Sequence, residues 1–113
     1  MHLHGHDFYL LAQGIGAYNS SSVTLVTKNP PRRDVAMLPS SGYMVIGYQA
    51  NNPGAWLLHC HVGWHKGEGL ALQVVERYSE IATLIDYDTL NSTCSAWNTY
   101  ATANSIIEND SGV

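Results

Sequence analysis

Up to about residue 76, the chain consists of short apolar runs separated by turn-forming residues. Stretches that alternate or are rich in β-branched residues, and that end near Gly, Pro, Asn or Ser, predict β-strands. The expected strands are residues 7–13, 22–27, 32–38, 43–50, 55–61 and 70–76. Short strands at such close spacing are typical of an all-β sandwich or barrel.

Beyond residue 76 the spacing of apolar positions becomes helical. Residues 79–90 and 93–103 have apolar side chains three and four positions apart, which predicts two helices. Ile81, Leu84 and Ile85 would form an apolar face on the first helix. Ser92 or Thr93 would cap the second with a hydroxyl group. The chain therefore divides into a β-rich part, residues 1–76, and a helical extension with a polar tail, residues 77–113.

The composition narrows the class of protein. Among 113 residues, 45% are apolar and only 12% are charged, which suits a small β-rich globular domain. The net charge of −4 is mild and there is no basic patch, so nucleic acid is not an expected partner. No segment approaches the roughly 20 apolar residues that span a membrane, so a membrane is not expected either. Three glycosylation tripeptides favour a secreted glycoprotein, and they begin at Asn19, Asn91 and Asn109.

The candidate chemistry lies in two clusters that contain all six histidines of the chain. The first is "HLHGH", residues 2–6, and the second is "HCHVGWH", residues 59–65. Successive side chains of an extended segment point to opposite faces. His59 and His61 are therefore expected to project to one side and Cys60 to the other.

A thiolate with imidazoles and a weak or absent axial ligand is the blue-copper arrangement for electron transfer. A helical turn in residues 62–69 would return His65 to the side on which Cys60 lies. Gly69 and Leu70 are the candidates for the axial position, and Leu70 offers no donor atom. A site without an axial thioether stabilises Cu(II) less and has a higher reduction potential.

His2 and His4 form a second alternating pair. Together with the two histidines that flank Cys60 they supply four imidazoles without a thiolate, which suits copper that handles dioxygen. Gly5 is expected to bend the chain before His6. We therefore predict that His6 forms structural hydrogen bonds and does not bind metal.

Other uses of these residues are weaker. A zinc protease would place a glutamate directly after the first histidine of His61-X-X-X-His65, where this chain has Val62. Structural zinc on Cys60 and Cys94 lacks any C-X-X-C spacing. A disulfide between these two cysteines is the simplest alternative, but it leaves the flanking histidines unexplained.

The two histidine motifs resemble copper-binding signatures of the multicopper oxidases: "HCHVGWHKGEGLALQ" is similar to the last signature and "HLHGHDF" to the one before it. "NPPRRDVAMLP" and "NNPGAWLLHCH" resemble the third cupredoxin domain of laccases, particularly those of ascomycete fungi, and the final "DSGV" is similar to the processed end of that subgroup. The resemblance implies an all-β, cupredoxin-like Greek-key β-sandwich or barrel with short C-terminal helices and an extended tail. Residues 1–76 would then be part of the third cupredoxin domain.

The resemblance also implies copper as the cofactor, with four coppers in a full-length chain. The implied roles are type 2 ligand for His2, type 3 ligand for His4, His59 and His61, type 1 ligand for Cys60 and His65, and a non-coordinating axial position for Leu70. His6 belongs to the family motif without being a ligand.

The implied activity is oxidation of phenols coupled to the reduction of dioxygen to water. A phenol would lose one electron at the exposed edge of His65, and the electron would pass through Cys60 to the type 3 ligands His59 and His61. These four are the expected catalytic residues. Trp64 would either wall the phenol pocket or pack in the core.

Two alternatives remain open at this point. A ferroxidase or an ascorbate oxidase belongs to the same superfamily, although an ascorbate oxidase normally has Met where this chain has Leu70. A single-domain cupredoxin that only carries electrons is disfavoured, because a carrier needs one copper and this chain has two His-X-His motifs.

Three parts of the family pattern are not in this sequence. The first is the histidine that is the third strong type 1 ligand, which the family places two residues before the position of Met1. The second is the set of first-domain histidines of the copper cluster. The third is the first-domain cysteine that pairs with Cys94 in the family. Together they predict a C-terminal fragment of a longer enzyme, with the N-terminal cupredoxin domains as its partners. Alone, the fragment is not expected to reduce dioxygen. In the family, the tail at residues 110–113 enters the channel to the copper cluster.

Overall fold

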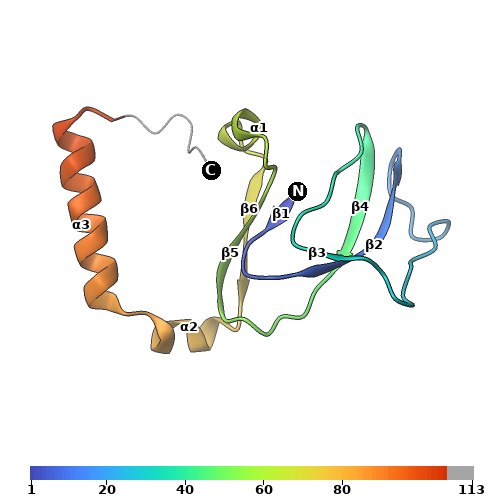
Figure 1. Cartoon of the computed structure of the whole chain (residues 1–113), viewed down its shortest axis with the longest axis horizontal. Helices are drawn as coiled ribbons and strands as arrows, with labels where there is room; N and C mark the ends of the chain where they lie inside the picture. Colours follow the sequence, from blue (N-terminus) through green and yellow to red (C-terminus); the bar gives the residue numbers. More distant parts are fainter. Residues whose placement is uncertain (107–113) are drawn as a thin grey trace.

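The computed structural model describes residues 1–106 and contains two small antiparallel sheets followed by helices (Figure 1). The first sheet has the strand order β1 (His2–Leu3), β5 (Gly54–His59) and β6 (Ala71–Glu76). The second has the order β3 (Arg32–Arg33), β2 (Phe8–Ile15) and β4 (Gly42–Gly47). The helices are α1 (Gly63–Gly67), between β5 and β6, followed after the last strand by α2 (Tyr78–Leu84) and α3 (Tyr87–Ala103).

Gly5 lets the chain pass from one sheet to the other within a few residues. Its φ is +70°, and a Cβ atom at this position would lie 2.5 Å from the indole of Trp56. Glycine adopts this backbone without strain and leaves room for the ring. The turn therefore places β1 beside β5 in the first sheet and sends the chain directly into β2 of the second.

The core is small and draws on both sheets. Leu3 and Phe8, which lie on either side of the Gly5 turn, are 1% and 0% exposed, and Ala36 joins them. Partly buried side chains pack around these three: Leu10, Met44, Ile46, Tyr48, Trp56, Leu58 and Val74. The apolar positions of the two sheets thus form one shared core.

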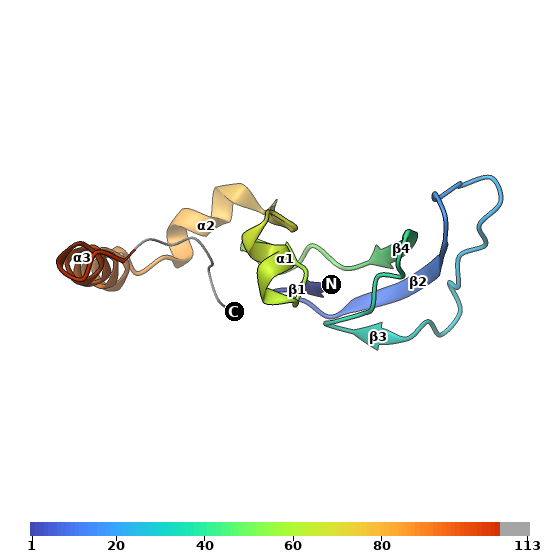
Figure 2. The same cartoon turned by 90° about the horizontal axis from the view of Figure 1, so that it is seen from above.

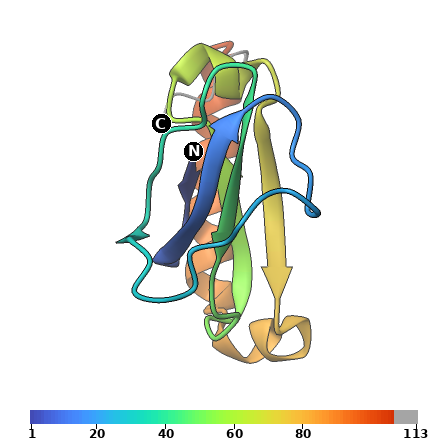
Figure 3. The same ribbon diagram turned by 90° about the vertical axis from the view of Figure 1, so that its right-hand side faces the viewer.

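The chain is elongated. Its radius of gyration is 17.7 Å, against about 13 Å for a compact domain of this length. Helix α3 stands apart from the sheets in Figures 1 and 2 and lies behind them in Figure 3. No residue of α3 is buried, and Leu90 is 45% exposed. No helix within residues 1–106 combines the length and apolar character needed to cross a membrane.

Two of the six expected strands differ from the structure. Residues 22–27 form no strand, because almost all their side chains are exposed and no buried face fixes a register. The segment meets β2 through the Val26 amide, which donates to the Leu11 carbonyl at 2.8 Å. Of residues 32–38, only Arg32 and Arg33 form a strand, β3, which pairs with β2. The segment then changes partner, and Val35 forms a bridge to His2 of β1. The remaining four strands are confirmed with shifted ends.

The prediction of one helix over residues 79–90 is wrong. Helix α2 ends at Leu84, and α3 begins behind Asp86, whose carboxylate accepts the amide hydrogens of the next turn. Aspartate is a strong N-cap, so it starts the helix early, and the expected caps Ser92 and Thr93 lie inside α3. Leu84 is 65% exposed, whereas Ile81 and Ile85 are half-buried, so the described residues cover the expected apolar face of the first helix only in part.

The expected fold class is confirmed in part. Both sheets are antiparallel and share a core, as the strand pattern predicts. The C-terminal helices are not all short, because α3 has 17 residues. The expected extended tail lies largely outside the described residues.

Candidate metal centre

Four imidazoles are neighbours where β1 pairs with β5. The strand register places His2 opposite His59, and the latter is completely buried. The rings of His4 and His61 come to the same side, so the two histidines that flank Cys60 lie together, as alternation predicts. The ring centroids are separated by 4.8 Å for His2–His4, 5.1 Å for His4–His59, 5.6 Å for His2–His59, 5.7 Å for His59–His61 and 5.9 Å for His2–His61. We call these four residues the imidazole cluster.

Backbone carbonyls orient two rings of the imidazole cluster. His59 Nδ1 lies 2.9 Å from the carbonyl oxygen of Cys60, and His2 Nδ1 lies 2.8 Å from that of Asp34. A carbonyl only accepts hydrogen bonds, so Nδ1 carries the proton in both rings. Each Nε2 then presents a lone pair, which is the arrangement that metal-binding histidines adopt in proteins.

His4 faces His59 directly, with 3.0 Å between their Nε2 atoms. Because His59 presents a lone pair there, His4 Nε2 donates the proton of this hydrogen bond. Burial lowers the pKa of His4, and the neighbouring His2, His59 and Lys66 lower it further. A neutral imidazole is the form that binds a metal, so the cluster favours the metal-competent state of His4.

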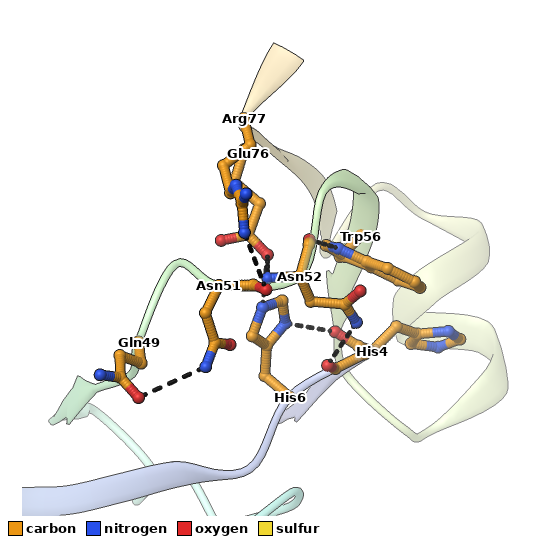
Figure 4. A network of polar contacts seen from close by, with 9 residues as sticks. His4, His6, Gln49, Asn51, Asn52, Trp56, Glu76 and Arg77 are labelled. Atoms are coloured by element: carbon orange, nitrogen blue, oxygen red, sulfur yellow. Dashed lines mark hydrogen bonds and ion pairs between the residues drawn. The ribbon is translucent and has the colours of Figure 1, made fainter. Parts of the chain in front are cut away.

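His6 differs from the imidazole cluster because both of its ring nitrogens already have partners. Nδ1 lies 2.9 Å from the carbonyl oxygen of His4, and Nε2 lies 2.5 Å from Oε1 of Glu76 (Figure 4). The side chains of His6 and Glu76 are only 3% and 5% exposed. The prediction that His6 forms structural hydrogen bonds is confirmed.

The second group is a thiol–imidazole pair formed by Cys60 and His65, with 3.6 Å between Sγ and Nδ1. Strand β5 ends at His59, and α1 then turns the chain back, as expected for residues 62–69. Leu70 closes this loop: its carbonyl accepts from the Cys60 amide at 3.0 Å, and its amide donates to the His65 carbonyl at 2.9 Å. The backbone thus holds the thiol, the imidazole and the expected axial residue together.

The thiol–imidazole pair lies on an open surface. His65 is exposed, and Leu70 is 44% exposed. Trp64 contacts the His65 ring edge-on and is 68% exposed, so it does not pack in the core that the described residues form. A cavity of about 540 Å³, lined mainly by apolar side chains of residues 1–37, also includes Cys60 and His61 in its wall.

Neither group is a complete metal site by itself. Within residues 1–106, no three His, Cys, Asp or Glu side chains converge on one point that could hold a metal ion. Cys60 and Cys94 are both free, so the disulfide alternative is wrong. The imidazole cluster and the thiol–imidazole pair are thus two candidate partial donor sets, and residues 59–61 join them covalently.

Two groups that orient the site were not expected from the sequence. Glu76 holds His6, and the available signal was a lone carboxylate that closes the apolar run of residues 70–76. The Asp34 carbonyl holds His2, and no sequence signal exists for it because every residue has a carbonyl.

Comparisons of the sequence and of the fold with known proteins point to one family. The sequence profile of the family "Multicopper oxidase" matches residues 1–80. Laccase-1 of Botryotinia fuckeliana is 49% identical over 116 residues, covering 100% of this chain and 20% of that protein. Dihydrogeodin oxidase of Aspergillus terreus is 42% identical over 121 residues, covering 100% of this chain and 20% of that protein. The crystal structure of a laccase from Botrytis aclada matches with a TM-score of 0.84 at 49% identity, covering 99% of this chain and 21% of that one.

The chain belongs to the multicopper oxidase family, which confirms the resemblance of its histidine motifs. The structural match identifies its two sheets as part of a cupredoxin domain. The chain spans about one fifth of the length of the curated relatives that it matches.

Proposed function

We propose that this chain is the C-terminal part of a laccase-type multicopper oxidase that oxidises phenols by one electron and reduces dioxygen to water. The observation that carries this proposal is the continuity of residues 59–61. Cys60 belongs to the thiol–imidazole pair, while both of its neighbours belong to the imidazole cluster. An enzyme that takes electrons at one metal site and uses them at another needs a short connection of this kind.

The donor chemistry fits copper. A thiolate and an imidazole without a strong axial donor suit an electron-transfer copper, and clustered imidazoles suit coppers that react with dioxygen. The proposed ligands are His2 for type 2 copper, His4, His59 and His61 for type 3 copper, and Cys60 and His65 for type 1 copper, with Leu70 axial and non-coordinating. When bound, the coppers supply the one-electron oxidation of the phenol and the reduction of dioxygen.

The residues of this chain orient the donors and expose one of them. The carbonyls of Cys60 and Asp34 fix which nitrogen of His59 and His2 faces the metal. The exposed edge of His65 is accessible to a phenol. Trp64, edge-on to this ring, forms one wall of the approach.

The proposal extends to parts outside this chain. The incomplete donor sets are completed by a further type 1 histidine and by histidines of N-terminal cupredoxin domains. Residues 1–76 then form part of a third, Greek-key cupredoxin domain, and residues 77–113 form its extension. The exposed side of α3 packs against the N-terminal domains, where Cys94 finds its partner. The proposed role of residues 110–113 as a channel plug lies outside the described residues.

Secretion is part of the same proposal. Asn19 and Asn91 are exposed, as glycosylation requires, and Asn109 lies outside the described residues.

A cysteine exchange in the full-length enzyme tests the proposed function. Cys60→Ser should abolish both the blue absorption and phenol oxidation, because serine cannot supply the thiolate. Cys94→Ser is the matched control and should keep the blue absorption, since Cys94 lies in α3 and outside both donor sets. Phenol turnover retained in Cys60→Ser would refute the proposal.

A further inference from the structure

Glu76 is a buried carboxylate to which the proposed function gives no role. Its Oε1 lies 2.5 Å from Nε2 of His6 and accepts the Asn52 amide hydrogen at 3.2 Å. Its Oε2 is buried and has no hydrogen-bond partner among residues 1–106. Burying a half-satisfied carboxylate costs free energy, and an apolar side chain would fill the same space more favourably. The carboxylate therefore needs an explanation other than stability.

The network around Glu76 converges on the turn that follows β1 (Figure 4). His6 Nδ1 donates to the carbonyl of His4 at 2.9 Å, and the Asn52 side chain donates to the carbonyl of Gly5 at 2.9 Å. The indole of Trp56 donates to the Asn52 carbonyl at 2.7 Å. Glu76 closes β6, and β5 lies between β6 and β1 in the sheet. Its carboxylate thus ties the far edge of the sheet to the turn that carries His4.

The His6 ring has little freedom to reorient. Besides its two hydrogen bonds, it meets Tyr48 and Trp56 edge-on, with ring centroids 5.1 and 5.9 Å away. A ring flip would exchange Nδ1 and Nε2 for carbon atoms and break the bonds to Glu76 and to the His4 carbonyl together. The contact with Glu76 therefore helps to keep Nδ1 of His6 directed at the carbonyl of His4.

His4 depends on this backbone support. The Nδ1 atoms of His2 and His59 donate to carbonyls, whereas no hydrogen bond within residues 1–106 reaches Nδ1 of His4. Both backbone polar groups of His4 are instead hydrogen-bonded: its amide donates to the Leu57 carbonyl at 2.8 Å, and its carbonyl accepts from His6. The direction of the His4 ring is thus set through its main chain.

We propose that Glu76 is a positioning residue for the imidazole cluster, acting through His6 on the main chain of His4. This inference rests on the proposed function, because it assigns Glu76 to the copper that His4 helps to hold. Glu76 itself touches neither copper nor substrate. Partners that orient a metal-binding histidine typically contribute 10- to 100-fold, roughly, to metal affinity.

The first test compares two Glu→Gln exchanges in the full-length, copper-loaded enzyme. Glu76→Gln should weaken copper binding by the imidazole cluster roughly tenfold, measured as copper lost to a competing chelator, because a neutral amide holds His6 less strongly than a carboxylate does. The blue absorption of the thiol–imidazole copper should be unchanged. Glu80→Gln is the matched control, because Glu80 forms an exposed ion pair with Arg77 and should change neither readout.

Two results have distinct meanings. Copper retention in Glu76→Gln equal to that in Glu80→Gln, with intact blue absorption, overturns the positioning role and leaves the proposed function standing. An unmodified enzyme that shows no blue absorption and binds no copper overturns the proposed function itself.

A second pair of variants keeps the test decisive if Glu76→Gln does not fold. The amide of His6→Asn takes the place of Nδ1 and keeps the bond to the His4 carbonyl, whereas the amide of His6→Gln takes the place of Nε2 and keeps only the contact with Glu76. The proposal expects His6→Gln to lose copper from the imidazole cluster at least as readily as Glu76→Gln, and His6→Asn to retain more. Equal retention in the two His6 variants, or the reverse order, overturns it.

Discussion

The carbonyl oxygen of Leu70 lies 3.0 Å from the amide nitrogen of Cys60, so the main chain itself ties the thiol to the expected axial residue. This bond continues the pairing of β5 with β6 beyond the last residue of the strand, where His59 pairs with Ala71. It does not depend on the side chain at position 70. A substitution there can therefore change the chemistry beside the thiol without moving the loop that carries it.

Leu70→Met in the full-length enzyme should lower the reduction potential of the type 1 copper. A thioether near the axial position stabilises Cu(II), whereas leucine offers no donor. A redox titration that follows the blue absorption measures the change. Leu72→Met is the control and should leave the potential unchanged, because Leu72 is an exposed residue of β6, two positions after Leu70. A titration midpoint that does not move in Leu70→Met contradicts the axial assignment.

Gly5→Ala should destabilise the full-length enzyme more than Gly16→Ala does. Both glycines have positive φ, +70° and +84°, so a side chain adds strain of about 1–2 kcal/mol at either position. At Gly16 the new Cβ atom meets nothing within 4 Å, but at Gly5 it lies 2.5 Å from the Trp56 indole. Overpacking should add roughly 1–3 kcal/mol at Gly5 alone.

Denaturant unfolding of the two glycine variants measures this difference in the free energy of unfolding. Gly5→Ala should also lower the copper content of the imidazole cluster, because the Gly5 turn carries His4. Equal destabilisation by the two substitutions would show that the Trp56 ring moves aside without cost.

The relative positions of the candidate donors were predictable because their pattern is local. Residues 59–65 are consecutive, so strand alternation and one helical turn suffice to place Cys60 with His65 and apart from the imidazole cluster. The groups that orient those donors are remote in sequence. Glu76 lies 70 residues from His6, and the Asp34 carbonyl lies 32 residues from His2, so only the folded chain brings them together.

The predicted strands and helix that differ from the structure also depend on contacts that a local sequence pattern does not reveal. Residues 22–27 have good strand propensity, but propensity without a paired and buried face does not make a strand. Residues 32–38 form one apolar run that serves two sheets in turn, first beside β2 and then beside β1. The break between α2 and α3 comes from the carboxylate of Asp86, a single capping residue inside a helical pattern.

Asp86 should make the helicity of α3 depend on pH. Its carboxylate accepts the Thr89 hydroxyl hydrogen at 2.7 Å and the amide hydrogens of Asp88 and Thr89 at 3.2 Å. The bonds from Thr89, the hydroxyl above all, lower the pKa of Asp86 below its usual 3.8. This pKa is lower in the helix than in the unfolded chain. The ionised cap therefore stabilises the helix fully at pH values above the pKa of Asp86 in the unfolded chain. That stabilisation is lost as the pH falls through the helical pKa.

Circular dichroism of a peptide spanning residues 85–106 measures this effect. An isolated helix of this length is marginal, so its helicity responds to a single cap. Because the peptide contains a second aspartate, Asp88, the matched control is Asp86→Asn: asparagine keeps the cap acceptor and does not ionise. The unmodified peptide should lose more helicity than Asp86→Asn on acidification, and Asp86→Ala should be less helical even at neutral pH. Identical acid titrations of the unmodified and Asp86→Asn peptides would exclude the carboxylate of Asp86 as the source of the pH dependence.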